Sequence, residues 1–204
     1  WEEENKYILT RTISDEEFIK KNNLKHTEFN NIKSVWLNKL KIARKEKKKP
    51  GLDYKIITSW NGLMISGYVN AYKAINDEVF MNEAINAGEF IYSNLVKRDG
   101  GLFHNYVNGQ SKINGYLEDY AMVIQASLDL YEITLNQLWI ERALKLSEYV
   151  INNFSSSESE LFYFTSKKDE DLISRSVEFR DNVIPSSNSI MAKNLFRLYH
   201  YFDK

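Results

Sequence analysis

The stretch TSWNGLMISGYVNAY, Thr58 to Tyr72, is an apolar run without a single charged residue, and it begins with a tryptophan and an asparagine. Its apolar residues recur every three or four positions, which is the period of an α-helix. A helix that carries so little charge is typical of one surrounded by other helices. We therefore predict a buried inner helix whose first turn, with Trp60 and Asn61, lines a pocket.

The pattern repeats 59 residues further along the chain. Matching pairs are Tyr72 with Tyr131, Ala84 with Ala143, Phe90 with Tyr149, and Leu102-Phe103 with Leu161-Phe162. The match continues for roughly forty residues without a gap, which indicates two copies of one helical hairpin unit. A third copy begins near Asn188. In each complete copy a helix with few charges is followed by one with a single apolar stripe, so we expect inner and outer helices to alternate.

This alternation predicts an all-α fold, a toroid of αα-hairpins; a superhelical solenoid and an irregular bundle are the alternatives. We expect a leading segment, 1–27, whose short helix opens with the capping box Ser14-x-x-Glu17. The partial toroid is expected to span 28–204. Its predicted helices are 28–49, 59–76, 78–97, 119–135, 137–154 and 187–203.

The composition excludes several classes of protein. The chain has 204 residues, 43% of them hydrophobic, and a formal charge of -1, which provides no general attraction to nucleic acid or to an anionic membrane. Cysteine is absent, and no apolar run approaches the roughly 18 residues of a membrane span. The basic run ARKEKKKPG is interpreted as a solvated helix end. We expect a cytoplasmic protein and, because no initiator methionine is present, a fragment.

Polar residues gather at the predicted starts of the inner helices, where long connections that could hold β-hairpins, 97–118 and 155–187, also arrive. The three starts read Ser59-Trp60-Asn61, Glu118-Asp119-Tyr120 and Ser186-Ser187-Asn188. Capping explains the small polar residues. It does not explain two aromatic rings and a further carboxylate, which suit sugar stacking and proton transfer.

Four carboxylates are the candidate catalytic residues: Glu118, Asp119, Glu178 and Asp181. Glycoside hydrolysis requires two carboxyl groups about 5 to 10 Å apart, one with a raised pKa. The candidate substrate-binding residues are Trp60, Asn61, Tyr120, His104, Arg175, Ser186 and Asn188. Arg175 and Arg180 would either neutralise the carboxylates or bind an anionic group of a ligand. Three scattered histidines and no cysteine predict neither a metal site nor a cofactor.

Three ordered motifs, LDYKIITSWNGLMI, YLEDYAMVIQASLDLYEIT and RSVEFRDNVIPSSNSIMAKNLFRL, resemble the spermatogenesis-associated protein 20 family. The resemblance implies a thioredoxin-like domain, absent from this chain, followed by an (α/α)6 toroid similar to N-acylglucosamine 2-epimerases and six-hairpin glycosidases. This chain would then supply about half of that toroid. The family pattern differs at Asp181-Asn182-Val183, and at Ser187, which replaces a glycine.

Three functional hypotheses follow. In the first, the domain is a carbohydrate-active hydrolase or epimerase that uses carboxylate acid/base chemistry on a sugar-like ligand. In the second, it is a non-catalytic module that binds ligands or proteins for a thioredoxin-like domain. In the third, the polar helix starts only hold hairpins in place, and Trp60 and Tyr120 are buried. A partial toroid leaves apolar faces open, so we expect self-association or cover from missing segments, with Tyr68, Tyr72, Leu198 and Tyr199 at those faces.

Overall fold

The computed structural model describes residues 10–157, 159–169 and 174–203, and it confirms the all-α class. The chain divides into two compact units, Trp1–Leu52 and Asp53–Lys204. Residue 28, the predicted start of the toroid, lies in the first of these units. The division falls later because the extended, exposed stretch 47–55, which contains Pro50 and Gly51, separates the second helix from the rest of the chain. Each unit is described by itself.

The first unit is a helical hairpin of α1 (Asp15–Lys21) and α2 (His26–Glu46). The predicted capping box is present: Ser14 Oγ accepts the Glu17 N–H at 3.1 Å, and Glu17 Oε2 accepts the Ser14 N–H at 3.0 Å. The ring of Phe18 contacts those of Phe29 and Trp36. Phe29 is the one buried residue of α2.

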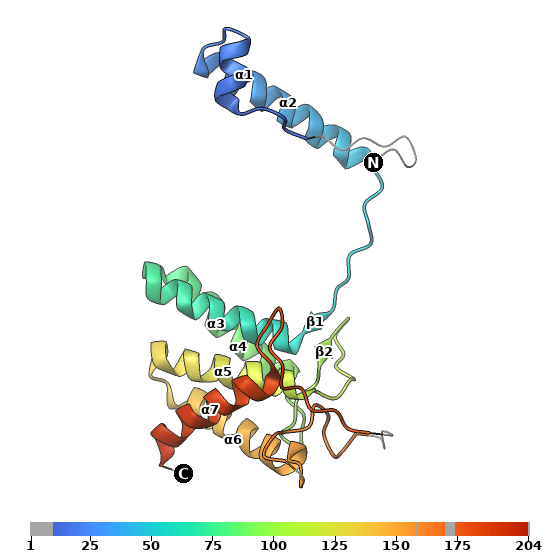
Figure 1. Ribbon diagram of the computed structural model, residues 1–204, viewed down its shortest axis with the longest axis vertical. Coiled ribbons are helices and arrows are strands. Elements are labelled where there is room, and N and C mark those ends of the chain that lie inside the picture. The colour runs from blue at the N-terminus through green and yellow to red at the C-terminus, as the bar shows by residue number, and fades with distance from the viewer. Residues whose placement is uncertain (1–9, 158, 170–173, 204) are drawn as a thin grey trace. The chain divides into compact units, whose positions relative to one another are not determined.

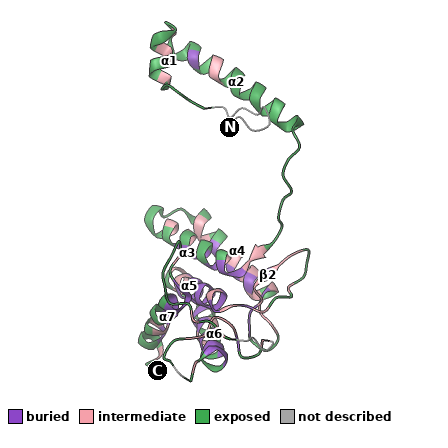
Figure 2. Ribbon diagram, turned by 45° about the vertical axis from the view of Figure 1, so that its right-hand side comes forward, coloured by how far each residue is buried: buried purple, intermediate pink, exposed green. Residues whose placement is uncertain are grey.

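The second unit holds β1 (Ile56–Ile57), α3 (Thr58–Ile75), α4 (Glu78–Asn94), β2 (Asn105–Tyr106), α5 (Leu117–Thr134), α6 (Gln137–Phe154) and α7 (Ser187–Phe202). Helix α5 packs against α3, α6 and α7, while α4 packs on α3 (Figure 1). Buried residues are concentrated on α5, as Figure 2 shows. The predicted alternation is therefore correct: α3, α5 and α7 are the inner helices, and α4 and α6 are the outer ones.

The first long connection forms the predicted β-hairpin, since antiparallel bridges join Phe103 with Asn114 and Val107 with Gln110. Its strand β2 also pairs with β1 ahead of α3, in antiparallel register with Ile56 opposite Tyr106 and Ile57 opposite Asn105. The Thr58 N–H also donates to the His104 carbonyl at 2.9 Å. In the described part of the second connection, Ser155 and Phe162 form an isolated bridge. The β1–β2 pairing fixes the first turn of α3 beside His104.

Helices α3 and α5 approach most closely at Gly62. A Cβ placed there would lie 2.8 Å from the Met122 carbonyl carbon and 2.9 Å from its oxygen. These are backbone atoms, which cannot rotate away as a side chain could. A Cβ at Gly67, on the same helix, would meet nothing within 4 Å.

We predict opposite effects for alanine at these two glycines. Gly62→Ala should lower the free energy of unfolding by about 1–3 kcal/mol, because α3 and α5 must move apart. Gly67→Ala should raise it by about 0.4–1 kcal/mol, because the unfolded chain loses conformational freedom. Urea denaturation followed by circular dichroism measures both. Equal effects of the two substitutions would contradict the close approach.

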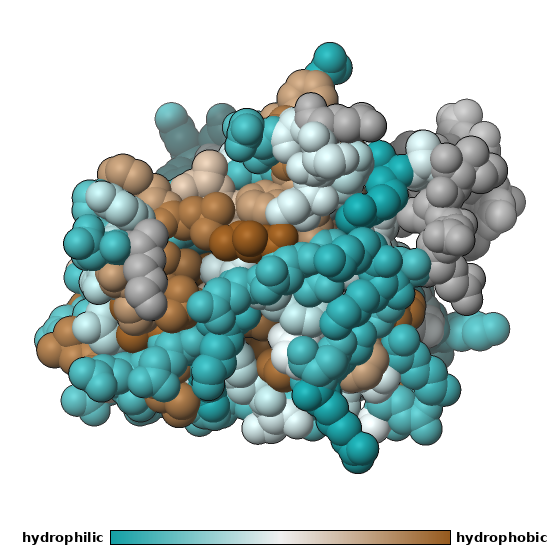
Figure 3. Space-filling model, turned by 90° about the horizontal axis from the view of Figure 1, so that it is seen from below, coloured by the Kyte–Doolittle hydropathy of each residue, from teal (hydrophilic) through white to brown (hydrophobic). Residues whose placement is uncertain are grey.

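Exposed apolar side chains lie on α3 and α7, the helices at the two ends of the inner row; they are Leu63, Met64, Ile75, Phe196, Tyr199 and Tyr201. Hydrophobic surface is visible in the space-filling view (Figure 3). The expectation for Leu198 is wrong, since this residue is buried, whereas Tyr68 and Tyr72 are half-buried. None of the described helices is long and apolar enough to cross a membrane.

We predict that the chain self-associates through these open faces, because burial of the apolar surface on both end helices lowers the free energy. Light scattering should detect species larger than a monomer at micromolar concentration. The paired substitution Met64→Lys and Phe196→Lys should reduce their fraction without altering the helical circular dichroism signal. A stable, monodisperse monomer of the unmodified chain would refute the prediction.

Candidate functional site

The starts of α3 and α5 are joined through the carboxylate of Asp119, which is fully buried. Its Oδ1 accepts the Ser59 N–H at 2.9 Å, and its Oδ2 accepts the Tyr116 N–H at 2.9 Å. The same Oδ2 lies 2.9 Å from His104 Nδ1. Asp119 is a predicted catalytic residue, but its oxygens hold two helix starts and one imidazole, so it is not free to act on a substrate.

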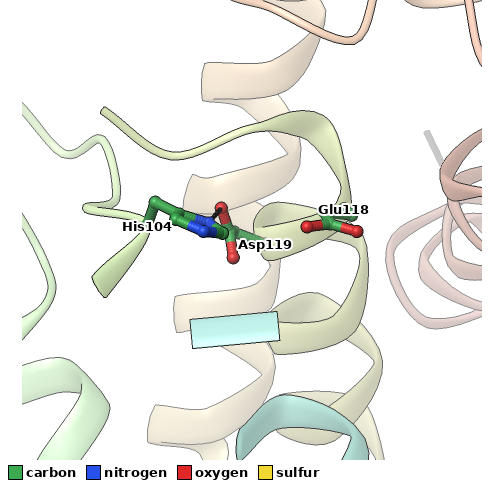
Figure 4. Close-up of side chains that lie close together, drawn as sticks. All are labelled: His104, Glu118 and Asp119. Atoms are coloured by element: carbon green, nitrogen blue, oxygen red, sulfur yellow. Dashed lines mark hydrogen bonds and ion pairs between the residues drawn. The ribbon is translucent and has the colours of Figure 1, made fainter. Parts of the chain in front are cut away.

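His104 is held on three sides. Its backbone N–H donates to the Ile113 carbonyl at 2.8 Å, and its ring lies 4.9 Å, centroid to centroid, from the ring of Tyr116. Tyr116 in turn stacks on Phe164 at 5.1 Å. With Nδ1 directed at Asp119, the nitrogen left for a ligand is Nε2 (Figure 4). His104 was a predicted ligand contact, and the structure places it at the helix starts.

The charges of this cluster shift its proton affinities. The hydrogen bond to Asp119 raises the pKa of His104. Burial raises the pKa of Glu118, and the neighbouring Asp119 raises it further. Burial also raises the pKa of Asp119, while the hydrogen bonds from His104, Tyr116 and Ser59 act in the opposite direction. A carboxyl with a raised pKa therefore lies beside an oriented imidazole.

The side chains of His104 and Glu118 both line a cavity of about 410 Å³. It is lined by Asp53, Lys55, Ile57, Trp60, His104 and Glu118. Trp60 is 69% exposed, so its ring is accessible from solvent at the cavity. That the ring stacks on a ligand stays a prediction. Asp53 and Lys55, which the sequence analysis did not identify, enter the cavity wall because they immediately precede β1.

Tyr120 does not line this cavity. It is 2% exposed, its hydroxyl accepts the Leu102 N–H at 2.8 Å, and its ring stacks on Tyr149 at 5.4 Å. The prediction that Tyr120 stacks on a ligand is therefore wrong. As a residue of the first turn of α5, it points inward, where it fixes the loop before His104.

Glu178 and Asp181 cap α7 instead of completing a pair with Glu118 in the cavity. Glu178 Oε2 accepts the N–H and the hydroxyl of Ser187. Asp181 Oδ1 accepts the Ser186 N–H at 2.8 Å and the Ser189 hydroxyl at 3.0 Å, and these bonds lower the pKa of Asp181. Neither carboxylate lines the cavity, although the charge of Glu178 contributes to the raised pKa of Glu118. A catalytic pair of carboxyl groups stays a prediction.

The remaining predicted binding residues have structural partners. Ser186 Oγ accepts the Ser189 N–H as the cap of α7. The Asn188 amide nitrogen donates to the carbonyls of Phe162 and Glu178. Asn61 plays the same part on α3, donating to the Ile57 carbonyl at 2.8 Å. These residues tie helix starts to the segments that precede them.

Arg175 does not clamp the predicted carboxylates. Its guanidinium lies 4.1 Å from the centroid of the Tyr163 ring and donates to the Thr165 carbonyl. Arg180 lies near the Phe179 ring. The predicted ion pairs with Glu178 and Asp181 are not among the contacts of the described residues.

His104, Glu118 and Asp119 also place one possible metal-ligand atom each within 4.8 Å of one another. Asp119 Oδ2 already accepts hydrogen bonds from Tyr116 and His104, whereas Oδ1 accepts one, from Ser59. The cluster is thus an imidazole–carboxylate pair with an adjacent carboxyl group.

Solved structures with the same arrangement of helices include several carbohydrate enzymes. Cellobiose 2-epimerase from Bacillus thermoamylovorans has a TM-score of 0.59 at 16% identity, covering 74% of this chain and 41% of that one. D-mannose isomerase has a TM-score of 0.60 at 14% identity, covering 74% and 37%. Unsaturated glucuronyl hydrolase from Bacillus sp. GL1 has a TM-score of 0.59 at 16% identity, covering 78% and 43%. These likenesses show the fold, part of an (α/α)6 toroid.

No protein-family model matches the chain. Among curated proteins, an uncharacterised protein of Caenorhabditis elegans is 31% identical over 98% of this chain and 28% of its own length. Human spermatogenesis-associated protein 20 is 34% identical over 81% of this chain and 22% of its own length. The chain thus spans less than a third of these relatives. Over about four fifths of its length, it belongs to the spermatogenesis-associated protein 20 family.

Proposed function

We propose that the cavity at the starts of α3 and α5 binds a carbohydrate-like ligand, and that Glu118 donates a proton to it. The domain would then be part of a carbohydrate-active hydrolase or epimerase. One observation carries the proposal: of the four predicted catalytic carboxyls, Glu118 is the one that lines the cavity. Its raised pKa keeps it protonated at higher pH than an ordinary glutamate, as a general acid requires.

The other walls of the cavity fit a sugar. The exposed ring of Trp60 provides an apolar face on which a pyranose ring stacks. His104, Asp53 and Lys55 provide polar groups around it, which suit hydroxyl groups. Enzymes that share the fold act on carbohydrates, which supports such a ligand. The reaction, however, depends on these side chains and not on the fold.

A second candidate is a non-catalytic module that binds ligands or proteins for a thioredoxin-like domain. The observation in its favour is that Asp119, Glu178 and Asp181 are all engaged as helix caps or hydrogen-bond acceptors. Trp60 remains exposed, as this candidate also requires.

Two substitutions separate binding from proton transfer. Trp60→Ala should weaken the binding of a mono- or oligosaccharide about tenfold, since the lost stacking and burial contribute about 1–2 kcal/mol. Glu118→Gln should leave binding within about threefold but lower turnover by about 10²–10⁴-fold, because an amide has no proton to donate. Calorimetric titration and product analysis on a sugar panel measure the two effects. Val79→Ala, which shortens a similarly exposed apolar side chain on the outer helix α4, is the control and should change neither.

The pH profile supplies an independent test. If protonated Glu118 is the donor, turnover is present below its pKa and lost as the pH rises through it. Because that pKa is raised, the loss should occur above the usual range of a glutamate, and Glu118→Gln should abolish this limb of the profile. Binding of sugars without any turnover would favour the second candidate, and no binding of sugars would contradict a carbohydrate site.

A further inference from the structure

We propose that two copies of this chain pair through their end helices, with α7 of each copy packed on α3 of the other. The pair then forms a ring of six inner helices, because each copy contributes α3, α5 and α7. Six is the number of inner helices in the (α/α)6 toroids that share this fold. The pairing does not depend on the proposed function, but it completes the same cavity.

The repeat defines two faces on every inner helix. An offset of 59 residues aligns α3 with α5, and an offset of 127 aligns α3 with α7. Gly62 of α3 lies against Met122 of α5, and Ser66 Oγ donates to Asp129 Oδ2 at 2.6 Å. We call the face with Gly62 and Ser66 the forward face, because it meets the next inner helix along the chain. The face with Met122 and Asp129, which meets the previous inner helix, is the rear face.

The forward face is buried on α3 but exposed on α7. On α3 it comprises four buried residues, Gly62, Ile65, Ser66 and Val69. The repeat aligns these, in order, with four exposed residues of α7, Ser189, Ala192, Lys193 and Phe196. Helix α7 therefore presents to solvent the face by which α3 packs on α5.

The rear face shows the opposite pattern. Four of its positions are buried on α5, namely Met122, Val123, Ala126 and Leu130. The aligned residues of α7 are also buried: Ile190, Met191, Asn194 and Leu198. On α3, in contrast, the aligned Leu63, Met64 and Gly67 are exposed. Helix α3 therefore presents to solvent the face by which α5 and α7 pack on the helix before them.

These two exposed faces are the halves of one kind of contact. A forward face meets a rear face between α3 and α5, and again between α5 and α7. The forward face of α7 and the rear face of α3 would form a third contact of the same kind, and a second copy of the chain offers both. Leu63, Met64 and Phe196 are apolar, so the contact removes apolar surface from water. A contact between unlike faces either closes into a ring or continues as a filament, and two arcs of three helices close.

The repeat also gives the register of the contact. Lys193 is aligned with Ser66, and Asn70 is aligned with Asp129, the residue that accepts from Ser66. Lys193 of one copy therefore lies opposite the partner's Asn70. Both side chains are exposed in the single chain.

The pairing adds a wall to the candidate cavity. Within the chain, the Ser59 N–H of α3 donates to Asp119 of α5. The repeat aligns Ser59 with Ser186 and Asp119 with Trp60, so Ser186 of one copy lies beside the partner's Trp60. Asp181 accepts the Ser186 N–H at 2.8 Å and accompanies it. Each cavity thereby gains a carboxylate from the other copy.

Introduced cysteines test the contact directly, because the chain contains none of its own. The double variant Asn70→Cys and Lys193→Cys should form a covalent dimer on mild oxidation, detected by non-reducing electrophoresis. A mixture of the two single variants should form it as well. Each single variant alone is the matched control and should stay uncrosslinked. Circular dichroism confirms that the variants fold.

Charge supplies a second test. Sedimentation equilibrium of the unmodified chain should give the mass of two chains, without further growth at higher concentration. Asn70→Lys should weaken the pairing by about three- to tenfold, because a cation faces Lys193 in both contacts of the ring. Adding Lys193→Glu should restore it. Asn82→Lys, the same change at an exposed position of the outer helix α4, is the control and should have no effect.

The contrary outcomes are distinct. A monomer at about 100 µM would overturn the pairing, and growth into larger species would overturn the closed ring. Crosslinking of Asn70→Cys alone would indicate contact between two α3 helices and overturn the register. None of these readouts needs a ligand, so failure of the proposed carbohydrate site leaves them unchanged. If a sugar does bind, equal affinity of the unmodified dimer and of Asn70→Lys diluted to a monomer would overturn the added wall of the cavity.

Discussion

The buried carboxylate of Asp119 is the constraint on which the candidate site depends. A fully buried carboxylate is costly unless its oxygens accept hydrogen bonds, and here they are offered by Ser59, Tyr116 and His104. Those three donors come from the start of α3, the segment before α5 and the loop that leads into β2. One acceptor therefore sets the position of two inner helices and one imidazole. Without this carboxylate, the starts of α3 and α5 and the imidazole of His104 would lose the acceptor that holds them together.

Few of the polar residues at the helix starts face a ligand, because most of them form hydrogen bonds that hold the helix starts in place. Each inner helix has backbone N–H groups at its start that need acceptors, and each is preceded by a connection that must be held in place. Asn61 and Asn188 do equivalent work on α3 and α7, each bonding a carbonyl of the preceding segment. Glu178 and Asp181 satisfy the start of α7. Glu118 and Trp60 remain on the cavity side, and the proposed chemistry depends on them.

The arc of three inner helices also accounts for the exposed apolar surface. Helix α5 has neighbours on both sides and is the most completely buried, whereas α3 and α7 each have one inner neighbour. This chain covers roughly two fifths of the solved toroids that share its fold, so the rings of those proteins contain further helices. Helix α3 carries both an exposed apolar face and Trp60 of the cavity, so contacts made by that face would affect a helix that shapes the cavity.

The sequence by itself determined the fold class, the alternation of inner and outer helices and the location of the polar face, because these follow from periodicity and from a repeat of 59 residues. It also placed Trp60, Glu118 and His104 at that face. It did not determine which carboxylates are free, because capping and catalysis use the same residue types. That choice depends on which N–H groups lie within 3 Å of each oxygen. Tyr120 was misplaced for a related reason: whether an aromatic in a first helical turn points into the core or into a cavity is decided by the rotation of the helix in its packing, which only the tertiary structure shows.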